Sequence, residues 1–98
     1  MSRYMLAPEA SEDLDDIWEY ITADNLDAAD RWVARLFDAF DQIAQNPGIG
    51  HRRTDLTNEA VLFWPVGRYL IIYRIAATVG IVAVTQGSRD IPQFLRNR

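Results

Sequence analysis

The sequence contains no cysteine and no lysine, and it has a single histidine, His51. Without cysteine, neither a disulfide framework nor a thiolate zinc site can form. One histidine lacks the usual companions of a metal site or a catalytic triad, so His51 is interpreted as a solvated loop residue. No segment approaches the roughly 20 apolar residues of a membrane span, and the start of the chain lacks the hydrophobic region of a signal peptide. These absences predict a cytoplasmic protein with no metal, cofactor or membrane partner.

Composition predicts one small domain with an uneven charge. The 98 residues, 49% of them apolar, suit one hydrophobic core and are too few for two, so we predict a single domain over residues 1–98.

The two halves of the chain differ in charge. Residues 1–47 carry eleven Asp or Glu and three Arg, whereas residues 48–98 carry three Asp or Glu and seven Arg. Because a guanidinium is a planar fork of donors suited to carboxylate or phosphate, we expect an anionic partner for the second half. The alternative is that Arg merely replaces Lys throughout.

The first half of the chain predicts a short strand at residues 4–7 followed by two helices. Pro8 suits the first turn of a helix, whose apolar stripe consists of Ala10, Leu14, Ile17, Trp18 and Ile21. A second, longer stripe runs from residue 29 to residue 44, with Asp24 or Asn25 as the predicted N-cap. Because the linker is short, residues 9–45 are predicted to form an antiparallel helical hairpin with Trp18 and Trp32 in its core.

The first helix also carries an acidic face. Its carboxylates are those of Glu12, Asp13, Asp15, Asp16 and Glu19. Four of them, Glu12, Asp15, Asp16 and Glu19, share one broad face that invites a carboxylate metal site, but the Glu-x-x-His companion of helical two-metal sites is absent. We therefore interpret the carboxylates as a solvated face.

The second half predicts a polar loop, three strands and a final short helix. Residues 61–64, 69–75 and 79–86 are rich in β-branched and aromatic side chains, and their tight connections favour an antiparallel meander. Asp90 is placed to cap a helix that begins near Ile91, with Gln93 in the capping-box position. The predicted fold class is α+β with the order β-α-α-β-β-β-α.

Both faces of the strand at residues 69–75 are apolar at its centre. Alternation places Tyr69, Ile71, Tyr73 and Ile75 on one face and Arg68, Leu70, Ile72 and Arg74 on the other. The hairpin can cover one face, but little of the chain is left to cover the second, and large bare apolar patches are unusual. We therefore predict that a partner covers the second face by contacting Phe63, Trp64, Leu70 and Ile72. For Trp64, burial in the chain's own core is the favoured interpretation, and contact with the partner is the alternative.

Four fragments, in this order and spacing, resemble the RelE/ParE superfamily of bacterial type II toxins, and specifically its ParE branch. They are Leu6-Ala7-Pro8-Glu9-Ala10 with Asp13-Leu14 and residues 17–21; Asn46-Pro47-Gly48-Ile49-Gly50 running to residues 53–56; residues 66–74, Val-Gly-Arg-Tyr-Leu-Ile-Ile-Tyr-Arg; and Gly87-Ser88-Arg89-Asp90. The resemblance covers nearly the whole chain. It implies a curved, mainly antiparallel sheet against a helical hairpin. The sequence departs from the pattern at Gln86, where a histidine often stands.

The resemblance implies a toxin that is neutralised by a cognate ParD-like antitoxin in a hetero-oligomer, with operator DNA bound only through the antitoxin. ParE-like members poison DNA gyrase, whereas RelE-like members cleave messenger RNA in the ribosome. The antitoxin is then the partner expected at Phe63, Trp64, Leu70 and Ile72. A third alternative is a degenerate toxin that survives only as an antitoxin-binding module.

The chemistry of the second half favours binding over catalysis. Metal-independent RNA cleavage needs a proton acceptor, a proton donor and cations that hold the phosphate. A guanidinium stays protonated and cannot act as the base, and residues 91–98 offer Phe94 but no group that titrates near neutrality. Tyr69 and Tyr73 are candidate acids or bases, although tyrosines that alternate along a strand are mostly structural. We therefore predict no catalytic residue.

The predicted surface that meets the target or the antitoxin consists of Arg68, Tyr69, Arg74, Arg89, Asp90 and Phe94. Its three arginines are expected to present a common cationic surface to an acidic part of a partner. For Arg89 and Asp90 the alternative is a helix cap and its ion partner.

Overall fold

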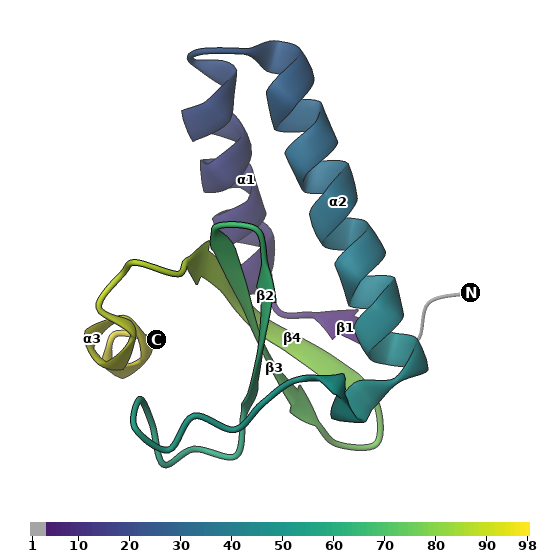
Figure 1. Cartoon of the computed structure of the whole chain (residues 1–98), viewed down its shortest axis with the longest axis vertical. Coiled ribbons are helices and arrows are strands. Elements are labelled where there is room, and N and C mark those ends of the chain that lie inside the picture. Colours follow the sequence, from purple (N-terminus) through teal and green to yellow (C-terminus); the bar gives the residue numbers. More distant parts are fainter. Residues whose placement is uncertain (1–3) are drawn as a thin grey trace.

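The computed structural model describes residues 4–98 and shows a helical hairpin packed against a mixed sheet (Figure 1). The elements follow the predicted order, with one added turn of 3-10 helix. They are β1 (Tyr4–Leu6), α1 (Pro8–Thr22), α2 (Leu26–Gln45), η1 (Pro47–Ile49), β2 (Leu62–Val66), β3 (Tyr69–Ile75), β4 (Val79–Gln86) and α3 (Ile91–Arg96). Residues 1–3, which belong to the start of the chain considered above for a signal peptide, lie outside the described residues. No helix within residues 4–98 has the length and apolar character needed to cross a membrane.

The four strands are arranged in the order β1-β4-β3-β2. The β2, β3 and β4 strands form the predicted antiparallel meander, and β1 adds to β4 in parallel through Tyr4–Val79, Met5–Gly80 and Leu6–Ile81. A parallel neighbour needs a long crossover, and the helical hairpin is part of that connection. Because β1 ends at Leu6, no strand within residues 4–98 lies beside the part of β4 beyond Ile81 on that edge.

Both helices of the hairpin begin as the sequence predicts. Pro8 stands in the first turn of α1, and Asn25 caps α2 by accepting a hydrogen bond of 2.9 Å from the backbone N–H of Ala28. The buried stripes of the two helices face the sheet and each other, and they form the main core with Val66, Tyr69, Ile71, Tyr73, Val79, Ile81 and Val84. In Figure 1 the outer end of the hairpin projects beyond the sheet.

The strand β2 is longer than predicted at its C-terminal end. The sequence analysis ended it at residue 64 and placed Pro65 in a turn, but β2 continues through Pro65 to Val66. Proline is tolerated there because β2 is the last strand in the sheet order, and the backbone bridge described on its outer side is at Phe63, with His51, rather than at Pro65. The turn comes instead at Gly67, whose φ of 59° favours glycine.

The second face of the sheet is not bare, which corrects the expectation that a partner must cover it. A second core cluster consists of Val61, Phe63, Ile72, Ala83, Ile91 and Leu95, with Leu56, Leu70, Val82 and Phe94 packed at its margin. Phe63 is 2% exposed and Ile72 is fully buried. The cover of this face comes from α3 and from the loop before β2. Neither is evident from the sequence, because α3 is only six residues long and the loop has no periodic pattern.

Candidate functional site

A hollow lies where α1, the end of β4 and α3 meet. Its volume is about 250 Å³, and its lining residues are Asp13, Asp16, Ile17, Tyr20, Tyr69, Val84, Thr85, Gln86, Arg89 and Phe94. Three of the residues predicted to bind a target, Tyr69, Arg89 and Phe94, are therefore brought together by the fold. This end of the sheet is the candidate functional site.

The segment Gly87-Ser88-Arg89-Asp90 is held in place by backbone hydrogen bonds at the end of β4. The N–H of Gly87 donates to the carbonyl of Arg68 at 2.8 Å, and the N–H of Arg89 donates to the carbonyl of Gln86 at 3.1 Å. Asp90 then caps α3 by accepting a hydrogen bond of 3.2 Å from the N–H of Gln93. The cap predicted for Asp90 is confirmed, and the turn fixes Arg68 and Arg89 at the same end of the sheet.

The exposed side chain of Arg89 is oriented by an aromatic ring rather than by a carboxylate. Its guanidinium carbon lies 5.0 Å from the centroid of Phe94, and that of Arg98 lies 4.7 Å from the same centroid. Cation–π contacts of this kind contribute about 0.5–1 kcal/mol at exposed sites. Because no carboxylate among residues 4–98 forms an ion pair with Arg89, its charge is available to a partner.

Tyr69 contributes to the site mainly as a support. Its side chain is buried, and its ring meets Trp32 of α2 edge-on, with 5.1 Å between the ring centroids. The guanidinium carbon of Arg68 lies 5.8 Å from each of these two rings. Tyr69 therefore anchors the hairpin to the sheet, and Arg68 is the exposed member of the group.

Arg74 does not join the other two arginines, which corrects the expectation of one common arginine surface. It pairs with Gly80 near the turn between β3 and β4, whereas Arg68 precedes β3 at its opposite end. Six residues of extended strand span roughly 20 Å. The sequence analysis placed both on the same face by alternation but did not consider their separation along the strand.

The four residues predicted to bind an antitoxin differ in accessibility. Phe63 and Ile72 are buried beneath α3 and its neighbouring loop, while Leu70 is half-buried at the margin of that cluster. Trp64 is half-buried and packs against the main core, so the favoured interpretation of Trp64 as a core residue agrees with its position. Only Trp64 and Leu70 are reachable without displacing α3.

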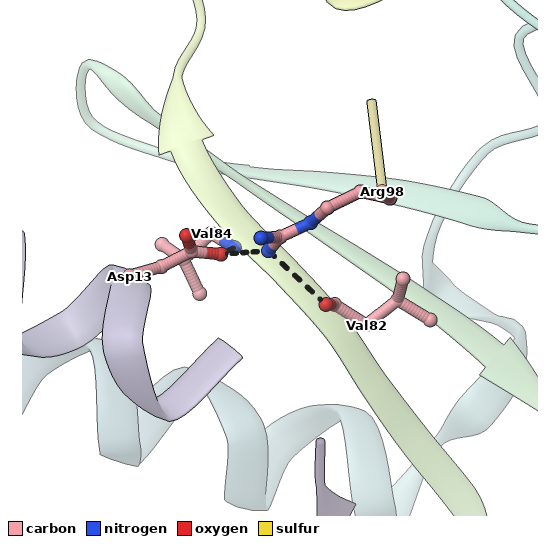
Figure 2. Close-up of polar contacts among 4 residues, drawn as sticks. All are labelled: Asp13, Val82, Val84 and Arg98. Atoms are coloured by element: carbon pink, nitrogen blue, oxygen red, sulfur yellow. Dashed lines mark hydrogen bonds and ion pairs between the residues drawn. The ribbon is translucent and has the colours of Figure 1, made fainter. Parts of the chain in front are cut away.

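Asp13 is a site residue that the sequence analysis missed, because its place among the carboxylates of α1 suggested a solvated face. The side chain is only 12% exposed and accepts a hydrogen bond of 3.0 Å from the N–H of Val84, on the part of β4 that β1 leaves unpaired (Figure 2). Arg98 pairs with the same carboxylate oxygen and reaches the carbonyl of Val82 at 3.4 Å. Burial raises the pKa of Asp13, and the Val84 and Arg98 contacts offset part of this rise.

The remaining titratable candidates have structural roles. The hydroxyl of Tyr73 donates to the carbonyl of Pro47 at 2.6 Å and accepts from the N–H of Gly50 at 2.9 Å, and burial raises its pKa. His51 is exposed, as predicted, and its backbone pairs with that of Phe63. Across residues 4–98, no three His, Cys, Asp or Glu side chains are grouped closely enough to hold a metal ion.

Taken together, the hollow is lined by the exposed guanidinium group of Arg89, the aromatic ring of Phe94 and the carboxylates of Asp13 and Asp16. Arg31 and Arg35 of α2 also lie beside Trp32, and they too were missed by the sequence analysis. The sequence does contain a signal for this pair: Arg31 and Arg35 are four residues apart, so they share one helix face with a tryptophan between them in the sequence. Such a surface is suited to binding an anionic or amphipathic partner.

Sequence comparison shows that the chain is similar to ParE toxins. Residues 4–91 match the family described as the ParE toxin of type II toxin-antitoxin system, parDE. The chain is 41% identical over 83 residues to the protein Y4kP from Sinorhizobium fredii, with 84% of each chain covered. It is 32% identical over 98 residues to Toxin ParE1 from Mycobacterium tuberculosis, with 96% of this chain and 98% of the relative covered.

The fold is also found among solved structures. A chain of the chromosomal ParDE TA system from P. aeruginosa superposes with a TM-score of 0.73. The superposition covers 88% of this chain and 96% of that chain, at 17% sequence identity. The similarity establishes a shared fold, a helical hairpin on a mainly antiparallel sheet.

Proposed function

Because this chain belongs to the ParE family of toxins from type II toxin–antitoxin systems, we propose that it poisons DNA gyrase by binding to it. In this proposal the toxin traps gyrase with its DNA cleaved, and no covalent chemistry is performed by the toxin itself. A ParD-like antitoxin neutralises it in a cytoplasmic hetero-oligomer and carries the contact with operator DNA.

The observation that carries the proposal is the pair of guanidinium groups of Arg68 and Arg89 at one end of the sheet, without carboxylate partners within residues 4–98. Arg89 stands beside Phe94 at the hollow, so a cation and an aromatic ring are presented together. Arginine and aromatic residues are enriched among the residues that dominate protein–protein binding energy. Asp90 supports this surface by capping α3, and its own contact with the target remains part of the proposal.

The test is a gyrase assay with the purified chain and two arginine variants. The wild-type protein is expected to inhibit supercoiling and to increase cleaved DNA. Arg89→Gln should weaken both effects about tenfold, because a charge-assisted hydrogen bond contributes about 1.5–3 kcal/mol. Arg52→Gln is the matched control, since Arg52 is also exposed but lies in the loop before β2. A chain that is toxic on expression but leaves gyrase unaffected would rule out this target.

The antitoxin is proposed to contact Trp64 and Leu70, the accessible members of the predicted set. Contact with Phe63 and Ile72 additionally requires α3 to move, because both are buried beneath it. Co-expression with the antitoxin should therefore protect the indole of Trp64 from quenchers. If the growth of cells that express this chain alone is unimpaired, the degenerate-toxin alternative is favoured instead.

A ribosome-dependent ribonuclease is the second candidate, and one observation favours it. Asp13 and Asp16 line the same hollow as Arg89, so carboxylates that can accept a proton stand near a cation that can hold a phosphate. Against it, the oxygen of Asp13 is already engaged by Val84 and Arg98. Primer extension on messenger RNA after induction separates the two, because discrete cuts within codons are expected only of the nuclease.

A further inference from the structure

Four residues gather on the hairpin side of the turn between β2 and β3. Trp32 of α2 is half-buried, and the guanidinium carbons of Arg35 and Arg68 lie 4.7 Å and 5.8 Å from its ring centroid. Arg31 joins Trp32, Arg35 and Ala28 in lining a hollow of about 290 Å³. We call Arg31, Trp32, Arg35 and Arg68 the arginine–tryptophan cluster.

The indole at the centre of the cluster is packed on two sides. Its edge-on contact with Tyr69 fixes it from one side. On another side the turn passes so close that a Cβ added to Gly67 would lie 2.5 Å from Cη2 of Trp32 and 3.4 Å from an Nη atom of Arg35. Because the ring is packed between Tyr69 and this turn, an incoming ligand would meet an indole that is already positioned and would lose less entropy on ordering it.

The positive charges of the cluster are not neutralised within the described chain. Over residues 4–98 the ion pairs within 4.0 Å are Arg53–Asp55 and Arg98–Asp13, and neither involves the cluster. Asp30, the acidic neighbour of Arg31 in the sequence, instead accepts a hydrogen bond of 2.9 Å from the indole of Trp18. Within residues 4–98, the three exposed guanidinium groups around this indole therefore have no carboxylate partner.

The net charge of the chain decides between two kinds of anionic partner. The whole protein carries a charge of −4, and residues 1–47, which include α1 and α2, hold eleven carboxylates. A long polyanion such as a nucleic acid would be repelled by the net negative charge of the protein, most of which lies in the half of the chain that carries α1 and α2. A peptide segment with a few carboxylates avoids this repulsion, since its charges need to reach only the arginines.

We propose that the arginine–tryptophan cluster docks an acidic peptide segment of a protein partner. Guanidinium forks bind carboxylates in a bidentate manner, and an apolar or aromatic side chain beside those carboxylates packs on the face of Trp32. The proposal concerns α2 and the turn at Gly67, and it does not require gyrase to be the target.

The test uses a short fluorescein-labelled peptide in which glutamates flank a single phenylalanine, titrated with the purified chain. Fluorescence anisotropy should show binding at low salt that weakens as salt is added. Arg31→Gln and Arg35→Gln should each raise the Kd about tenfold, which is the loss expected for one charge-assisted contact. Arg52→Gln should change the Kd by no more than about twofold, because Arg52 lies in the loop before β2.

Three outcomes would overturn the proposal. The first is a wild-type chain that does not bind the peptide at low salt. The second is equal Kd values for Arg31→Gln, Arg35→Gln and Arg52→Gln. The third is a labelled DNA duplex that binds more tightly than the peptide and is weakened by the same two substitutions, which would identify a nucleic-acid surface instead. Urea unfolding of each variant verifies that these exposed substitutions leave the fold intact. Loss of gyrase inhibition has no bearing on any of these readouts.

Discussion

The carboxylate of Asp13 closes the open edge of β4 by accepting a hydrogen bond of 3.0 Å from the N–H of Val84, 71 positions later in the chain. The contact stands where β1 has already ended, so it replaces a missing strand partner for this backbone group. Arg98 binds the same oxygen and reaches the carbonyl of Val82, so three segments meet at one carboxylate (Figure 2). This contact leads to the first two predictions.

Replacing Asp13 with Ala should lower the free energy of unfolding by about 2–3 kcal/mol, because the N–H of Val84 and the guanidinium of Arg98 both lose their acceptor. Urea unfolding followed by circular dichroism measures the change. Asp15→Ala, at an exposed position on the same helix, is the control and should stay within about 0.5 kcal/mol of wild type. Equal losses in the two variants would show that Asp13 has no special role.

The stability of the chain should depend on pH through Asp13. Burial raises the pKa of its carboxyl above the ordinary value of 3.8, so the folded state binds this proton more tightly than the unfolded state. The resulting stabilisation is complete below pH 3.8 and decreases as the pH rises through the folded-state pKa. The free energy of unfolding of wild type minus that of Asp13→Asn should therefore fall across this range. A difference that rises with pH would mean that Arg98 outweighs burial.

Gly50→Ala should destabilise the protein, because the added Cβ would lie 2.6 Å from the hydroxyl oxygen of Tyr73. That hydroxyl is held by Pro47 and by the N–H of Gly50, so it cannot move without losing a hydrogen bond. A loss of about 1–3 kcal/mol is expected, as for other overpacked sites. Gly48→Ala is the matched control, since an added Cβ there meets nothing within 4 Å. Thermal unfolding of both variants compares them directly.

Ile72→Ala tests whether the second face of the sheet is buried in the free protein. Ile72 is fully buried, and its truncation should cost about 2–5 kcal/mol. Ile75, on the same strand, is 53% exposed, so Ile75→Ala should cost no more than about 1 kcal/mol. If the two variants unfold at the same urea concentration, α3 does not cover this face in solution.

The elements and their order follow from local sequence patterns. The apolar stripes around Leu14 and Leu36 have helical spacing, Asn25 is a strong N-cap, and residues 69–75 alternate as a strand must. These features depend on neighbours a few positions apart, so periodicity and capping reveal them. The end of β2 was misplaced because Pro65 suggests a turn unless the strand is known to lie at an edge.

The tertiary structure alone decided which side chains meet. Asp13 lies three positions after Ala10 and four before Ile17 and so borders the apolar stripe of α1, but only the fold brings its carboxylate to the N–H of Val84, beyond the end of β1. Arg68 and Arg74 share a strand face but stand at opposite ends of β3. Sequence determined the helices, the strands and the family, since each depends on local pattern. The grouping of Arg68 with Trp32 and of Arg89 with Phe94 was decided by packing between distant or differently folded segments, which local pattern does not encode.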